Sequence, residues 1–149
     1  MSRLRIIAAP ILLLMIALSL TGCSRAATVE YIPEGGRYTL SELEAVARSV
    51  DISPLEDLAP EAITETRQTY LASLRGHGDK ASRVADVLTR DFPPATAAVP
   101  LLVEGAEVDG RMVWIIVEAW AEENGPLTHR RLWLLDQATY GLVDSISLR

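Results

Sequence analysis

The residues of this 149-residue chain that could support acid–base or metal chemistry are few, because it contains only two histidines. His77 lies between two glycines, with Asp79 as its nearest acidic neighbour, and His129 lies in a largely apolar segment. Neither histidine belongs to a ligand motif such as His-Glu-x-x-His. The sequence also lacks a Gly-x-Ser-x-Gly nucleophile motif and a glycine-rich phosphate loop. We therefore predict no catalytic set, no metal and no cofactor.

Glu118 and Arg131 are a more informative pair, because the pattern places them on an aromatic strand face. If Asn124-Gly125 is a two-residue turn, Glu118 faces Arg131 across two antiparallel strands. One interpretation is a shallow ligand or partner site framed by aromatic side chains. The other is an ordinary cross-strand ion pair beside core aromatics. The candidate face comprises Trp114, Glu118, Trp120, His129, Arg131 and Trp133.

Cys23 ends an apolar run that begins at Ile6 and follows Arg3 and Arg5. A charged segment followed by an apolar one is typical of an export signal. The tetrad Leu20-Thr21-Gly22-Cys23 resembles a bacterial lipobox, in which the cysteine thiol receives a diacylglyceryl group and the chain is cut just before it. The resemblance implies that residues 1–22 are a signal peptide. It also implies that acylated Cys23 anchors the protein to a lipid bilayer, facing the periplasm or the cell exterior.

An uncleaved membrane helix is the alternative interpretation of this segment. Residues 6–20 would form a helix about 22 Å long, shorter than a hydrocarbon core of about 30 Å. Pro10 further weakens a straight spanning helix. In Gram-negative lipoproteins the residue after the cysteine steers sorting, and Ser24 is compatible with the outer membrane.

The charge of the remaining chain restricts its partners. Without Arg3 and Arg5, residues 23–149 contain 12 Lys and Arg against 20 Asp and Glu. This acidic balance argues against nucleic acid as a partner, and it gives no electrostatic attraction to anionic lipid. The lipid itself must then supply the membrane affinity. Because Cys23 is the only cysteine, the domain has no internal disulfide and depends on its hydrophobic core.

The chain after Cys23 divides into a tether and one domain. Residues 23–38 show no sustained hydrophobic period and include Pro33 and Gly35-Gly36, so we expect a flexible tether. Residues 39–149 are expected to form a single domain. Its first helix follows a capping box of Thr39 and Glu42 and ends near Val50.

Three further helices are predicted in the first half of this domain. Ser53-Pro54 begins a short helix, and Pro60 begins the longest, which ends near Arg75 at two glycines. Asp79 begins the fourth, which ends before Pro93-Pro94. The inner side of the longest helix is predicted to consist of Ile63, Arg67, Tyr70, Leu71 and Leu74.

From Ala97 the hydrophobic period changes to that of strands. Strands are predicted at residues 99–108, 111–121, 127–135 and 142–148, with Asp109-Gly110 as the first turn. We predict an α+β fold, with two to four N-terminal helices packed on one face of a four-stranded antiparallel meander. The opposite, tryptophan-bearing face would then need helices that wrap around or an outside partner. The face suited to the helices comprises Val113, Ile115, Val117, Leu132 and Leu134.

The end of the chain has the order strand, Asp136, turn, Thr139, Gly141, strand. This order is similar to the ending of PepSY-type domains, small exported α+β modules thought to inhibit or bind partners. That family usually has Thr next to Gly, whereas Tyr140 separates them here. The resemblance implies a binding module and transfers no functional residue.

These patterns lead to three functional hypotheses. The first is a non-enzymatic lipoprotein whose domain binds an envelope protein or a small ligand through the tryptophan face. The second is a structural envelope lipoprotein in which two copies cover that face as a homodimer. The third is an envelope hydrolase that uses Glu118 or His129.

Overall fold

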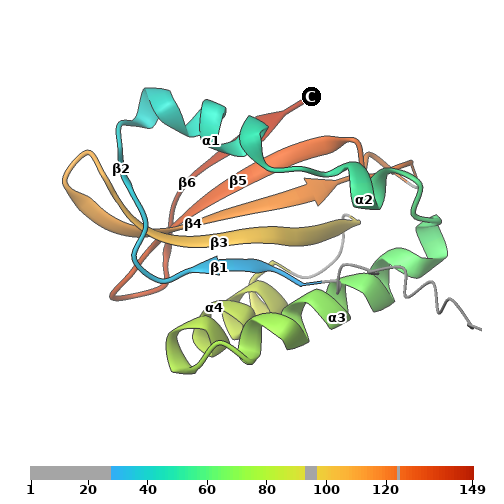
Figure 1. Cartoon of the computed structure of the whole chain (residues 1–149), viewed down its shortest axis with the longest axis horizontal. Coiled ribbons are helices and arrows are strands. Elements are labelled where there is room, and N and C mark those ends of the chain that lie inside the picture. Colours follow the sequence, from blue (N-terminus) through green and yellow to red (C-terminus); the bar gives the residue numbers. More distant parts are fainter. Residues whose placement is uncertain (1–27, 93–96, 124) are drawn as a thin grey trace, which may run out of the picture.

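The computed structural model describes residues 28–92, 97–123 and 125–149. The predicted signal peptide, Cys23 and the turn residue Asn124 lie outside the described residues. The described chain has a mixed fold of helices and strands, as predicted, built around a single sheet of six strands (Figure 1).

The four longest strands are the four that the sequence predicts. They are β3 (Ala98–Val108), β4 (Arg111–Trp120), β5 (His129–Asp136) and β6 (Leu142–Leu148). Each pairs antiparallel with the next along the chain. The predicted register of β4 and β5 is confirmed, with Glu118 opposite Arg131. Asp109 and Gly110 both have positive φ, 46° and 82°, which is the backbone of a tight hairpin turn.

The predicted four-stranded sheet is wrong, because two short strands precede the helices and extend it. These are β1 (Glu30–Ile32) and β2 (Arg37–Tyr38), and both run parallel to β3. The expected tether is therefore wrong over residues 28–38. Val29, only 2% exposed, enters the core beside β1. A strand of three residues is too short to show a hydrophobic period, and its partner lies far away in the sequence.

The helices have the predicted extents. They are α1 (Leu43–Ser49), α2 (Ser53–Glu56), α3 (Ile63–Arg75) and α4 (Asp79–Arg90), with 3-10 turns at Leu40–Glu42 and Pro60–Ala62. Glu42 Oε2 accepts the backbone N–H of Thr39 at 2.7 Å, as a capping box requires. All five residues predicted for the inner side of α3 are buried.

The helices cover both faces of the sheet, so their predicted placement on one face is wrong. Leu43 and Ala47 of α1 join the aliphatic face that includes Ile115 and Leu132. Helices α3 and α4 pack on the opposite face, which includes Trp114. Figure 1 shows α1 on one side of the sheet and α3 and α4 on the other. Leu55 of α2 packs into the cluster that α3 and α4 cover. Within the described ranges, no helix is long and apolar enough to cross a membrane.

Candidate functional site

Part of the face that the sequence suggested as a ligand site is buried in the hydrophobic core. Trp114 is 1% exposed and Glu118 is 0% exposed, because α3 and α4 lie over this part of the sheet. Trp120, His129, Arg131 and Trp133 are half-buried. The chain thus supplies its own cover for much of the tryptophan face. This removes the reason for expecting a partner or a second copy to cover it.

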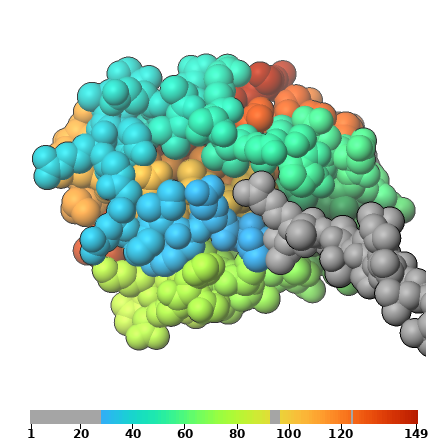
Figure 2. Space-filling model, viewed as in Figure 1, coloured from blue at the N-terminus to red at the C-terminus, as the bar shows by residue number. Residues whose placement is uncertain are grey.

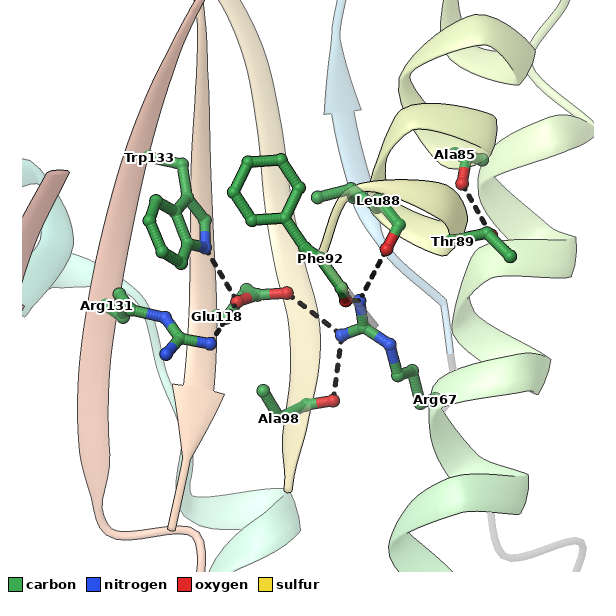
Figure 3. A network of polar contacts seen from close by, with 9 residues as sticks. All are labelled: Arg67, Ala85, Leu88, Thr89, Phe92, Ala98, Glu118, Arg131 and Trp133. Atoms are coloured by element: carbon green, nitrogen blue, oxygen red, sulfur yellow. Dashed lines mark hydrogen bonds and ion pairs between the residues drawn. The ribbon is translucent and has the colours of Figure 1, made fainter. Parts of the chain in front are cut away.

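Glu118 is the centre of a buried polar network (Figure 3). Its Oε1 accepts a hydrogen bond from Arg67 Nη1 at 2.9 Å. Its Oε2 accepts hydrogen bonds from Arg131 Nη2 at 3.0 Å and from the Trp133 indole at 2.8 Å. Both carboxylate oxygens are therefore occupied by strong donors. This arrangement suits a structural ion network and leaves no oxygen ready for acid–base chemistry.

Arg67 joins α3 to the sheet and to the end of α4. Besides Glu118, it donates to the carbonyl oxygens of Ala98, Leu88 and Phe92 at 2.9, 3.1 and 3.0 Å. The sequence placed Arg67 on the inner side of its helix but gave no sign of its partner. Three helix-end and strand carbonyls plus one carboxylate satisfy a guanidinium that would be costly to bury alone.

The half-buried aromatic residues contact one another and Arg131. The Arg131 guanidinium lies 4.5 Å from the centroid of the Trp133 ring and 5.7 Å from that of Trp120. Phe92 contacts Trp133, and His129 contacts Trp120, with centroid distances of 4.6 and 5.2 Å. These contacts occupy the ring faces that a flat ligand would need. His129 is therefore part of this group of aromatic contacts.

His77, the other histidine, lies between α3 and α4. Its ring centroid is 5.2 Å from that of Tyr31. Across the parts of the chain that the structure describes, no three His, Cys, Asp or Glu side chains are grouped so that they could hold a metal ion.

A groove of about 650 Å³ lies beside β1, on the side of the sheet edge where α1 and α2 pass. Figure 2 shows the hollow between the blue atoms of β1 and the teal atoms of α1, with atoms of β3 at its floor. Its apolar wall consists of Ile32, Val46, Val50, Leu101 and Leu102. A volume of this size is typical of small-molecule sites.

Glu104 of β3 lines this groove and is only 4% exposed. Its Oε1 accepts hydrogen bonds from the backbone N–H of Gly36 at 2.8 Å and from the Tyr38 hydroxyl at 2.9 Å. Burial and the neighbouring Glu104 carboxylate raise the pKa of Tyr38, which keeps its hydroxyl a donor. The carboxylate is therefore held in place by two neutral donors.

Gly35 completes the cradle around this carboxylate. The space that a side-chain Cβ would occupy at Gly35 is already filled by the Glu104 carboxyl group. The Gly35 backbone N–H donates to the carbonyl of Gly105 at 2.7 Å, which fixes the loop against β3. The Gly35-Gly36 pair therefore closes around a carboxylate, whereas the sequence suggested a tether. The sequence signal for this site was limited to a glutamate in the middle of a largely apolar run, residues 99–108, which also contains Glu107.

Glu104 and Glu118 are both buried, but their electrostatic surroundings differ. Glu118 is paired with two arginines. Within the described ranges, no Lys, Arg or His lies within ion-pair distance of Glu104. A buried carboxylate without a counter-ion is unfavourable unless another group neutralises it. Glu104 is therefore the described acidic side chain best placed to receive a charged ligand.

A second, more open cavity of about 420 Å³ lies at the turn between β5 and β6. Its rim includes Arg111 and Asp136, whose Nη2 and Oδ2 atoms are 2.9 Å apart. Asp136 Oδ1 also accepts the backbone N–H groups of Ala138 and Thr139 at 3.0 and 2.9 Å. These hydrogen bonds, the one from Thr139 first and that from Arg111 next, lower the pKa of Asp136 to about 2. Asp136 therefore stabilises the turn, and Arg111 at this rim is already paired with it.

Comparison with known proteins returned no matching family model, no matching curated protein and no matching solved structure.

Proposed function

We propose that this protein is a lipid-anchored, non-enzymatic binding module of the bacterial envelope, and that its ligand site is the groove beside β1. The observation that carries the site is a groove of small-molecule size with an apolar wall and a buried, held carboxylate. The anchoring rests on the lipobox resemblance at Cys23. The proposed activity is capture of a ligand, because the groove offers an apolar wall and a carboxylate that two hydrogen bonds hold in place.

The groove lies close to the proposed anchor along the chain. Thr28 lines the groove and is five residues after Cys23. Five residues of extended chain reach at most about 18 Å. A ligand in this groove would therefore be held near the bilayer surface if Cys23 carries the lipid.

The anchor is tested by the intact mass of protein extracted from membranes. We expect a mass that lacks residues 1–22 and includes the added diacylglyceryl group on Cys23. A Cys23→Ser variant should lose the acyl mass. Native protein that keeps its first 22 residues and carries no acyl mass would contradict the anchored form.

The groove is tested with n-hexanol as an uncharged probe on the full protein in lipid nanodiscs. Saturation-transfer NMR, with empty nanodiscs subtracted, should show saturable binding. Ser49 lines the groove and is exposed, so Ser49→Trp should block binding without unfolding the protein. The matched control is Gln68→Trp, at an exposed position of α3 outside the groove. Absence of saturable binding, or equal binding to both variants, would refute the groove as the site.

A further inference from the structure

We propose that the groove selects a small amphiphilic amine, with a positively charged ammonium group paired to Glu104 and an apolar body on the aliphatic wall. This inference rests on the proposed function, since it names the class of ligand for the same groove.

The sign of the charge follows from the groove lining. Three carboxylates line it, those of Glu30, Asp51 and Glu104, and none of its described lining residues is Lys or Arg. An anionic ligand would be repelled by the buried Glu104 carboxylate. A cationic group would meet a carboxylate that is 4% exposed and has no described cationic partner.

The ammonium group fits the free side of the Glu104 carboxylate. Gly36 N–H and Tyr38 Oη donate to Oε1, and no hydrogen bond from a described residue reaches Oε2. An ammonium carries three donors and no acceptor, so it can pair with Oε2 without displacing either existing donor. The two existing bonds fix the carboxylate before the ligand arrives, which reduces the entropy lost on binding.

The apolar body follows from the apolar residues that line the groove beside the acids. Leu101 and Leu102 of β3 are 9% and 5% exposed. Val46 of α1 and Val50 at its C-terminal end also line the groove. A bare metal ion would leave this wall unused, and the described carboxylates do not cluster as metal ligands. A fully polar polyamine would leave the wall unfilled as well. An alkyl or aryl ammonium uses both parts of the groove.

The test compares three probes with the same six-carbon chain: n-hexylammonium, n-hexanol and n-hexanoate. Each is titrated into the full protein in nanodiscs, with empty nanodiscs subtracted, and Kd is measured by saturation-transfer NMR. We expect n-hexylammonium to bind about tenfold or more tightly than n-hexanol, because a hydrogen bond to a charged group is worth roughly that factor. We expect n-hexanoate to bind more weakly than n-hexanol.

Glu104→Gln supplies the decisive variant. Gln keeps an acceptor for Tyr38 and Gly36 but loses the charge, so the preference for n-hexylammonium should disappear while n-hexanol binding stays. Glu107→Gln is the matched control, because Glu107 lies on the same strand outside the groove and pairs with Arg37. It should keep the preference. Circular dichroism melting of both variants confirms that they fold.

The outcomes separate this inference from the proposed function. Equal binding of n-hexylammonium and n-hexanol, or a preference that survives in a folded Glu104→Gln protein, refutes the amine while the groove stands. Failure of all three probes to bind refutes the groove itself. If Glu104→Gln does not fold, equal affinities of the wild-type protein for the three probes still refute the amine. Ordered affinities that Ser49→Trp abolishes support it.

Discussion

Glu118 is shielded from water, and its carboxylate accepts hydrogen bonds from two arginines and one indole. A buried ion network of this kind is destabilising once one member is removed, because the remaining charges stay buried without compensation. Arg67 is 4% exposed and cannot move to solvent without disturbing α3 and α4. The stability of the fold therefore depends on this carboxylate.

The first residue-scale prediction concerns Glu118→Ala. We expect the free energy of unfolding to fall by about 3–5 kcal/mol, the usual cost of breaking a buried ion pair. Urea denaturation followed by circular dichroism measures it. The matched control is Glu44→Ala, which removes an exposed pair with Arg48 on α1 and should cost at most about 1 kcal/mol. Similar losses in the two variants would contradict the network's role.

The second residue-scale prediction concerns the pH dependence of the β5–β6 turn. Asp136 has a pKa lowered to about 2 from 3.8, so its contribution to stability is present above pH 4 and is lost as the pH falls towards 2. Asp136→Asn should lower Tm at pH 7, and the difference from wild type should shrink between pH 4 and pH 2. Thermal melts across this range measure it. Asp144→Asn, an exposed position on β6, reports the background effect of removing a surface charge. A difference that persists unchanged at pH 2 would count against this assignment.

At the scale of elements, α1 is the cover of the aliphatic face. Leu43, the first residue of α1, is 0% exposed, whereas Leu40 in the preceding turn is 50% exposed. Leu43→Ala should therefore lower the free energy of unfolding by about 2–5 kcal/mol through lost burial and a residual cavity. Leu40→Ala is the matched control and should cost well under 1 kcal/mol, as surface substitutions usually do. Equal effects in urea denaturation would mean that α1 does not pack as described.

The elements that the sequence predicted correctly carry local signals. Asp109-Gly110 specifies a hairpin by itself, and the apolar spacing of α3 identifies its buried side, including Arg67. Strands β1 and β2 carry no such signal, because their stability comes from pairing with β3. The same applies to the faces of the sheet. Periodicity shows that both faces of the sheet are apolar. Which helix covers which face depends on the path of the chain from one side of the sheet to the other, and no local sequence pattern specifies that path.

The candidate site was less predictable than the fold for a related reason. The aromatic face had clear sequence signals, yet the structure closes much of it with its own helices. At the groove, Glu104 accepts hydrogen bonds from Gly36 and Tyr38, which are 68 and 66 residues away in the sequence. A buried carboxylate of this kind becomes recognisable only when its neighbours are known.

At the scale of the whole molecule, the acidic charge bears on how the proposed anchor would act. The chain after Cys23 is acidic, with 20 Asp and Glu against 12 Lys and Arg, so its surface does not favour an anionic bilayer. In the proposed form the acyl group alone would hold the domain there. The same acidic charge would raise the local concentration of cations near the groove.

The parallel pairing of β1 with β3 also bears on how the chain is made. Glu30 lies beside Leu102, so the first strand leaves the ribosome 72 residues before its partner exists. At a synthesis rate of about 5–20 residues per second, it waits about 4–14 s. During that interval the growing chain cannot complete its sheet, so β1 has no strand partner until β3 has been made.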